Sequence, residues 1–340
     1  MEEGRYIYGI IEESERKSFD LGGVDGDGEV YTITHRDIAC AVGNSPLRDY
    51  SSMLKEDLGR SLVKHQSIIE RVMEDYTVIP MKFGTLACND DEVVQILERG
   101  YSQFKELLTR MDGRIELDVA ATWDDLNNCI KEIGNEDKQI KELKAAISAR
   151  PPSETLQDKI KIGMMIKDAL DKKREKEQAY IEDFLKEVAG DSQTHQVMDD
   201  TMILNCAFLL EKAKEPDFDY RLKKLDEKYE QRVHFKCVGP LPPYSFATCQ
   251  LRKMSYGEIN EAARLLGLEN GVSLDQIKES YRHFAQKNHP DTDPENSRLR
   301  DDFEKTTKAY KLLTGCCQQG GIPFEDEKKE DFIMAEIMKP

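Results

Sequence analysis

The sequence predicts an α+β protein with two ferredoxin-like α/β sandwich domains, a long helical hairpin insertion and a C-terminal all-α module. Three observations predict this class. Short β-branched and aromatic runs alternate with long amphipathic patterns over residues 1–124. A charged helical pattern over 127–190 precedes a second set of strands. Three amphipathic helical segments then follow between 253 and 315.

Length and charge restrict the classes of partner. The 340 residues suffice for two or three domains, and the formal net charge is −17. An acidic surface disfavours nucleic acid and anionic membranes as general partners. No apolar run approaches the roughly 20 residues that span a bilayer, and the N-terminus lacks signal-peptide features. The eight cysteines form no Cys-x-x-Cys pair, so we expect a cytoplasmic protein with reduced thiols.

The first domain is expected to cover residues 1–124 and to pack around the stretch Tyr76–Leu86. Pro80 lacks an amide donor, which places it at a strand start, edge or bulge. Gly84 allows a backbone bend that a larger residue would resist. The expected elements are strands at 5–12, 29–34, 37–42, 78–85 and 114–122, and helices over 53–73 and from Asp90 or Asp91, as the cap, to Gly113.

Two features of this domain could indicate chemistry. The Gly- and Asp-rich stretch 19–28 could suggest calcium, but EF-hand spacing would put Gly23 and Thr34 at carboxylate positions, which favours a solvated loop. His65 has Lys64 and Gln66 as sequence neighbours and no readable nucleophile–acid pairing. We therefore expect a helix-surface histidine or a core histidine with a satisfied ring. No catalytic residue, metal site or cofactor is predicted.

The second domain is expected over 125–252 and includes the hairpin. Pro151–Pro152 interrupts the helical pattern, and Ser153 is expected to cap a second long helix. The apolar stripe Leu156, Ile160, Met164, Ala169 and Leu170 either packs within the hairpin, which we favour, or forms a partner groove. A buried strand at 202–210, a helix at 219–229 and a strand at 232–238 lead into an extended Pro-rich segment.

Two uncommon motifs, one in each of the two α/β domains, resemble the gas vesicle protein GvpL/GvpF family. Val78–Thr85 resembles V-x-P-x-[RK]-F-G-T, and Val238–Ala247 resembles [TS]-G-P-[WL]-P-P-Y-[SN]-F. The signature residues are Pro80, Phe83, Gly84, Gly239, Pro240, Pro242, Pro243, Tyr244 and Phe246. The resemblance reaches from residue 5 to about 252. It implies two α/β domains, no catalytic residues, and an accessory role in assembling gas vesicles through contacts with the shell protein and other accessory proteins.

The C-terminal module, 253–315, is predicted to contain three helices, over 258–268, from Ser273 onwards and over 299–313. Ser273 and Gln276 form a capping box, and Pro290 is placed to end the second helix. With His289-Pro290-Asp291 between two helices, residues 256–315 resemble a J-domain. In J-domains this tripeptide and the preceding basic helix engage a DnaK-type chaperone and trigger ATP hydrolysis. The residues that match here are Lys278, Arg282, Lys287, His289, Pro290 and Asp291.

This module departs from the J-domain pattern in two respects. Its basic run is thin, and Asn288 precedes the histidine where an aromatic residue is common. A J-like fold that serves only as a docking module is therefore the alternative to chaperone stimulation. Residues 316–340 predict an acidic flexible tail whose apolar part, 332–338, forms a short docking helix. Cys316–Cys317 has no zinc-spaced ligands nearby.

The sequence thus predicts a non-enzymatic accessory factor for gas vesicle assembly that binds shell or accessory proteins and recruits a DnaK-type chaperone. One rival is a general J-domain co-chaperone whose α/β region binds unrelated clients. Another is an enzyme with an unrecognised cleft, which would need converging titratable residues. The sequence contains no Gly-rich phosphate loop, Gly-x-Ser-x-Gly elbow or His-Glu-x-x-His motif.

Overall fold

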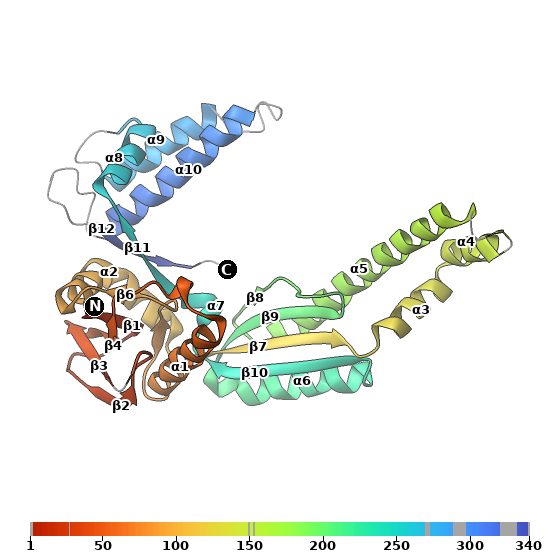
Figure 1. Ribbon diagram of the computed structural model, residues 1–340, viewed down its shortest axis with the longest axis horizontal. Coiled ribbons are helices and arrows are strands. Elements are labelled where there is room, and N and C mark those ends of the chain that lie inside the picture. Colours follow the sequence, from red (N-terminus) through yellow and green to blue (C-terminus); the bar gives the residue numbers. More distant parts are fainter. Residues whose placement is uncertain are drawn as a thin grey trace. The chain divides into compact units, whose positions relative to one another are not determined.

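The computed structural model describes residues 3–26, 28–148, 150–151, 154–268, 273–287, 297–319 and 332–338. The chain forms two compact units. The first combines Met1–Asp112 with Ala247–Met338, and the second is Gly113–Phe246. The predicted α+β class, with sheets in the N-terminal region and helices in the C-terminal module, is confirmed (Figure 1).

The first unit contains a six-stranded sheet in the order β2-β3-β4-β1-β5, with β6 also paired to β1. All the neighbouring strands pair antiparallel. β1 lies between β4 and β5, and its β-branched and aromatic side chains are buried, as the sequence predicts. The bounds are β1 Glu3–Ile11, β2 Ser18–Gly22, β3 Glu29–His35, β4 Ile38–Pro46, β5 Val78–Pro80 and β6 Leu86–Ala87.

Two amphipathic helices pack against this sheet: α1 (Lys55–Met73), after the 3₁₀ turn η1 (Tyr50–Ser52), and α2 (Asp90–Met111). The cap of α2 is Asn89, whose side chain accepts a bond from the Glu92 amide, so the expected cap at Asp90 or Asp91 is wrong by one residue. The buried face of α2 keeps the helical period, with Val93, Ile96, Leu97, Gly100, Phe104, Leu107, Leu108 and Met111.

The second unit has the ferredoxin-like connection β-α-β-β-α-β and a four-stranded antiparallel sheet in the order β10-β7-β9-β8. Ile115, Leu117 and Val119 of β7 share the face that packs on the helices, as their alternation predicts. The bounds are β7 Arg114–Trp123, β8 Asp191–Thr194, β9 Met202–Glu211, the 3₁₀ turn η3 Lys212–Lys214, α6 Glu215–Tyr229, β10 Val233–Leu241 and α7 Tyr244–Ala247.

The helical insertion of this unit consists of α3 (Leu126–Glu136), α4 (Lys138–Ser148) and the long α5 (Leu156–Lys186), seen as a projecting hairpin in Figure 1. Leu170 is buried, and Ile162, Met165, Ile166 and Ala169 pack against the core. The favoured packing of the stripe within the hairpin is wrong for Leu156, Ile160 and Met164, which are exposed. Ser153 lies outside the described residues.

The C-terminal part of the first unit contains three helices, α8 (Tyr256–Leu265), α9 (Leu274–Lys287) and α10 (Ser297–Gln318), as predicted. Ser273 and Gln276 exchange the two bonds of the expected capping box, at 2.8 and 3.3 Å. A two-stranded ribbon flanks these helices in the chain: β11 (Cys249–Met254) precedes α8, and β12 (Phe332–Ile337) follows α10. The docking helix expected at 332–338 is therefore a strand.

Three further local expectations are corrected. The stretch 19–28 is not wholly a loop, because β2 occupies its first part and pairs with β3. The strand expected over 78–85 ends at Pro80, and the chain then turns before β6. The segment 114–122 was expected to close the first domain, but as β7 it pairs with β9 and β10 in the second sheet.

Candidate partner-binding site

The first signature segment closes an aromatic cluster in the first unit. Gly84 has a positive φ of 82°, and its amide donates to Tyr6 Oη at 2.9 Å. The same hydroxyl lies 3.0 Å from His65 Nδ1. Phe83 packs edge-on against Tyr6, Tyr50 and His65, with ring centroids 5.2 to 6.2 Å apart. The signature therefore fixes the turn after β5 onto α1 and β1.

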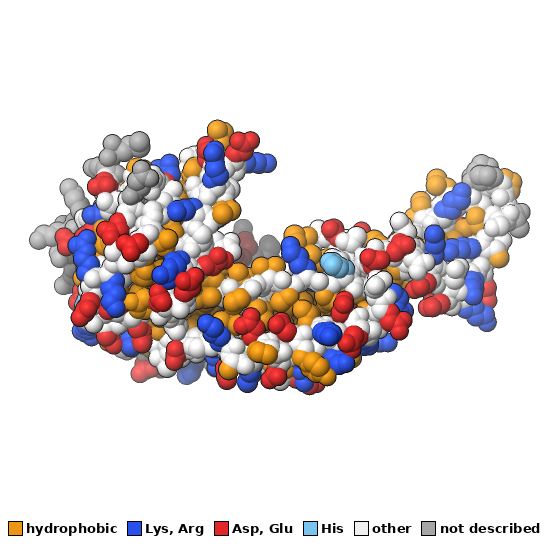
Figure 2. Space-filling view, turned by 90° about the horizontal axis from the view of Figure 1, so that it is seen from below, with side chains coloured by type: hydrophobic (Ala, Val, Ile, Leu, Met, Phe, Trp, Pro, Cys, Tyr) orange, Lys and Arg blue, Asp and Glu red, His pale blue; other side chains and the backbone are white. Residues whose placement is uncertain are grey.

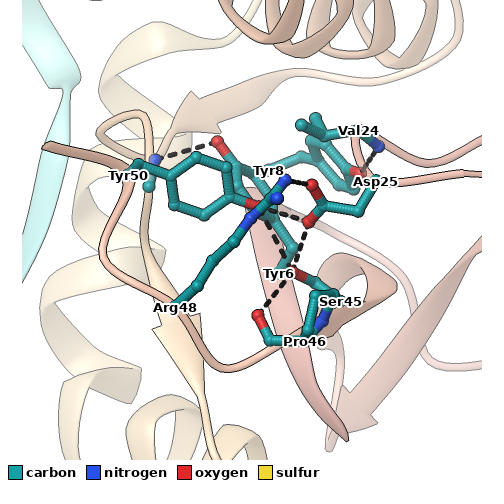
Figure 3. A network of polar contacts seen from close by, with 9 residues as sticks. Tyr6, Tyr8, Val24, Asp25, Ser45, Pro46, Arg48 and Tyr50 are labelled. Atoms are coloured by element: carbon teal, nitrogen blue, oxygen red, sulfur yellow. Dashed lines mark hydrogen bonds and ion pairs between the residues drawn. The ribbon is translucent and has the colours of Figure 1, made fainter. Parts of the chain in front are cut away.

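A polar network adjoins this cluster (Figure 3). The buried Asp25 carboxylate forms an ion pair with Arg48 and accepts hydrogen bonds from Tyr50 and Ser45. Tyr8 Oη accepts a bond from the Val24 amide at 2.9 Å. The interpretation of 19–28 as solvated is therefore wrong at Asp25, whose side chain is only 4% exposed. Its partners come from later parts of the chain, which sequence spacing could not reveal.

The side chains of Tyr6, Tyr8 and His65 stay neutral near pH 7. Burial lowers the pKa of His65 to about 4 and raises the pKa of Tyr8 to about 12. Burial also raises the pKa of Tyr6. A general base needs a pKa near the working pH and access to a substrate, and buried His65 with its ring bonded to Tyr6 meets neither condition. The prediction of a core histidine with a satisfied ring is confirmed.

The second signature segment anchors the end of β10 in the second unit. Gly239 has a φ of 147°, and the Gly239–Pro240 bond is cis. Ser245, between Tyr244 and Phe246 in the short helix α7, donates its amide and hydroxyl to the two oxygens of Glu116, each at 2.8 Å. Pro242 and Pro243 are buried beside it in the sequence. The segment is thus not extended throughout, since α7 follows it directly.

Glu116 lies in a small polar cluster with Ser245, Asp118 and His195. Burial raises the pKa of Glu116, and the nearby Asp118 carboxylate acts in the same direction, while the Ser245 bonds oppose it. His195 Nε2 lies 3.1 Å from Ser245 Oγ. In a Ser-His-acid triad the carboxylate contacts the histidine, whereas here it contacts the serine. This geometry suits an anchor between α7 and β7 rather than an activated nucleophile.

A cavity of about 230 Å³ lies in the second unit beside the end of β7. Four of its ionisable side chains contact one another in two pairs: Lys173 lies 3.8 Å from Glu132, and Tyr229 donates to Glu177 at 2.6 Å. Within the described ranges, no group of three or more His, Cys, Asp or Glu side chains is placed to hold a metal ion. These four side chains therefore form two mutual pairs, which is typical of structural contacts.

Two of the basic residues singled out in the sequence, Lys278 and Arg282, lie on helix α9 of the C-terminal module. Ile277, Ala309 and Leu313 form their core, and Tyr281 and Tyr310 stack with centroids 4.2 Å apart. Lys278 and Arg282 are four residues apart on α9, so they share a face; Arg282 is exposed and Lys278 half-buried. Lys287 ends this helix. His289, Pro290 and Asp291 lie outside the described residues. Cys316 is buried in this core, which raises the pKa of its thiol to about 12.

Charge is mixed on the face of the molecule that Figure 2 shows. Lys and Arg side chains alternate with Asp and Glu on the face shown in Figure 2. No helix in the part of the chain that the structure describes is long and apolar enough to cross a bilayer. The structure therefore defines a two-unit α+β protein with a C-terminal three-helix module.

Comparison with known proteins agrees with this class. Residues 4–248 match the model of the gas vesicle synthesis protein GvpL/GvpF family, and residues 264–316 match the DnaJ domain. The chain therefore belongs to the GvpL/GvpF family, whose members are non-catalytic, and it carries a DnaJ domain. The family match covers well over half of the chain.

Individual relatives extend this result. Gas vesicle protein F of Nostoc sp. strain PCC 7120 is 25% identical over 250 residues, covering 73% of this chain and 99% of the relative. The crystal structure of GvpF from Anabaena sp. PCC7120 matches with a TM-score of 0.63 and 24% identity, over 72% of this chain and 98% of that chain. DnaJ homolog subfamily C member 5 of Mus musculus is 42% identical over 50 residues, 15% of this chain and 25% of that protein.

Proposed function

We propose that this chain assists gas vesicle assembly by binding the shell protein or other accessory proteins and by presenting them to a DnaK-type chaperone. The two α+β units bind the clients. The C-terminal helices recruit the chaperone through His289, Pro290 and Asp291, together with Lys278, Arg282 and Lys287 of the helix before them. The work takes place in the cytoplasm, at growing gas vesicles.

The observation that carries this proposal is the joining of two modules in one chain. A GvpL/GvpF region over 4–248 supports a role in gas vesicle assembly, and a DnaJ domain at 264–316 supports a chaperone partner. Shell subunits that pack into a hollow protein wall expose apolar surface before assembly, and such surface aggregates without protection. A factor that holds the client and recruits a chaperone would keep the subunits competent to assemble.

The basic residues of α9 suggest which surface of the module contacts the chaperone. Lys278 and Arg282 lie one helical turn apart and can steer an acidic partner surface. Because Arg282 is exposed, Arg282→Glu should leave the helix core intact. We expect this variant to lose most of the stimulation of DnaK ATP hydrolysis, whereas Lys311→Glu, the same charge change on exposed α10 surface, should retain it.

A genetic experiment tests the whole proposal. The gene is deleted in a gas-vesicle-forming host, and the strain is complemented with the wild-type chain or with His289→Gln. Deletion should abolish flotation and His289→Gln should restore it poorly. Full flotation after deletion would refute the assembly role, and full rescue by His289→Gln would leave the J-like module as a docking element only. Capture of DnaK with diverse unfolded chains, but no gas vesicle protein, would favour the general co-chaperone.

A further inference from the structure

The β11–β12 ribbon has one strand edge that is already occupied. Gln319, at the end of α10, accepts a bond from the Ala335 amide at 2.9 Å and donates its side-chain amide to the Ala335 carbonyl at 2.5 Å. The backbone groups of Ala335 therefore point away from β11. Leu251 is the partner of Ala335 in the antiparallel ladder, and the two residues form a pair that is not hydrogen-bonded across the ribbon. The backbone N–H and C=O of Leu251 therefore point away from β12, to the opposite outer edge of the ribbon.

The outward groups of β11 recur at every second residue: Cys249, Leu251 and Lys253. The Cys249 carbonyl is used, since it accepts a bond from the Lys82 amide at 2.7 Å, beside a parallel bridge to Met81. Among the described residues, none bonds to the outward backbone groups of Leu251 or Lys253. We call these groups the β11 edge.

A groove of about 670 Å³ lies along the β11 edge, within the first unit. Gln250, Leu251 and Lys253 form one wall, and residues 82–86 with Cys88 form the other. The apolar lining comes from Leu47, Phe83, Leu86 and Leu251. An unpaired strand edge beside an apolar groove is the arrangement to which an extended peptide adds as a further strand.

The charge of the groove is opposite to that of the chain. Its lining contains Arg48, Lys82 and Lys253 and no carboxylate, although the net charge of the whole protein is −17. Arg48 and Lys253 are held by ion pairs to Asp25 and Glu92 behind the lining, while Lys82 contacts the Gln250 side-chain oxygen at 3.3 Å. Three cations less these two carboxylates leave a local charge of +1, carried by Lys82; because salt screens charges beyond about 8 Å, this near cation outweighs the distant acidic surface for a bound ligand.

We propose that the groove binds an extended segment of a partner protein that alternates apolar side chains with carboxylates and adds to the β11 edge as a strand. The backbone of the segment bonds to Leu251 and Lys253, its apolar side chains enter the lining, and its carboxylates meet Lys82 and its neighbours. β11 and β12 lie outside the two matched family regions, whereas the other side of the groove, residues 47–48 and 82–86 with Cys88, lies within the matched region 4–248. The inference holds whether or not a chaperone is recruited.

The test uses the full chain and a labelled decapeptide of alternating valine and glutamate, with binding followed by fluorescence anisotropy. Lys82→Glu should weaken binding at least tenfold, because the substitution reverses the charge of an exposed side chain in the groove. Lys236→Glu, the same change on the exposed surface of β10 in the second unit, should bind as the wild type does. Amide hydrogen exchange at Leu251 and Lys253 should slow on binding.

Two matched peptides separate strand addition from simple attraction. A peptide with N-methyl groups at alternate positions keeps the side chains but loses backbone donors; equal affinity for it would overturn the strand-addition proposal. A valine–lysine peptide keeps the strand propensity; equal affinity for it would overturn the charge argument. Self-association of the chain that Lys82→Glu abolishes would assign the groove to a second copy and overturn the partner named here. Loss of flotation in the genetic experiment is independent of these outcomes.

Discussion

Replacing Gln319 by alanine tests whether one side chain holds the end of the chain in place. Gln319 is 4% exposed and brackets both backbone groups of Ala335, which is itself 3% exposed. It also donates to Gln103 Oε1 on α2 at 2.8 Å. In Gln319→Ala the Ala335 amide and carbonyl lose their partners, and each unsatisfied buried group costs about 1–3 kcal/mol. We expect the local opening free energy of β12 to fall by about 2–6 kcal/mol, the sum for the two groups.

Amide hydrogen exchange with mass spectrometry measures this effect directly. A loss of about 2–6 kcal/mol corresponds to exchange of the β12 amides that is about 30 to 20,000 times faster. Gln103→Ala removes only the third hydrogen bond and should cost about 0.5–1.5 kcal/mol. Exchange in Gln319→Ala within threefold of wild type would refute the reasoning, as would equal losses in the two variants. The second unit, which contains neither residue, serves as the internal reference.

Three further substitutions test the anchors of the two signature segments, each by the free energy of unfolding from denaturant titration. Glu116→Gln should flatten the decline of stability between pH 4.5 and 8, because the raised pKa of Glu116 favours folding at low pH and this contribution is lost as pH rises. In the folded protein the pKa of His65 is about 4, below the model-peptide value of 6.5, so the free energy of unfolding falls by up to about 3 kcal/mol as the pH drops between these values. His65→Gln should remove this acid-induced loss of stability. Gly84→Ala should lower the free energy of unfolding by about 1–2 kcal/mol at any pH, because alanine is strained at a φ of 82°. Steric clash adds nothing, since the atoms nearest to the added Cβ, those of Tyr50, lie at an ordinary contact distance of 3.5 Å. Unchanged pH profiles, or a neutral Gly84→Ala, would contradict the respective anchor.

Sequence periodicity predicted most helices and strands because the local pattern alone decides them. The 3.6-residue period of α2 and the two-residue alternation of β7 each survive in the structure. The capping box at Ser273 and Gln276 was predicted for the same reason, since both partners lie within one turn. The class of fold follows from the order of such elements.

Decisions that depend on distant partners could not be made from the sequence. The apolar run 332–338 fits a helix or a strand equally by composition, and its strand state follows from pairing with β11, about 80 residues earlier. β7 follows α2 directly, yet its partners are β9 and β10. Asp25 looked like a loop residue because Tyr50 and Arg48, which bury it, stand more than 20 residues away.

The same limit explains the candidate sites. The signature residues were predicted as structural, and each contact of Phe83, Gly84 and the Ser245 segment described above is internal. The J-like residues stay a prediction at His289, Pro290 and Asp291, which lie outside the described residues. The β11 edge carries no sequence signal, because an unpaired backbone is defined only by where β12 and Gln319 lie.

The ribbon connects the J-like module to the first unit at both ends of the module, whereas a module on a terminal linker is connected at one end only. β11 leads into α8, and β12 follows α10 and pairs back onto β11, so the first unit holds both ends of the three helices. Gln319 adds a bond from the end of α10 to α2. A strand that binds at the β11 edge would therefore contact the element that begins the module. Client binding and chaperone recruitment would then share one structural element, so weakening β12 should affect both, whereas Lys82→Glu should affect the first alone.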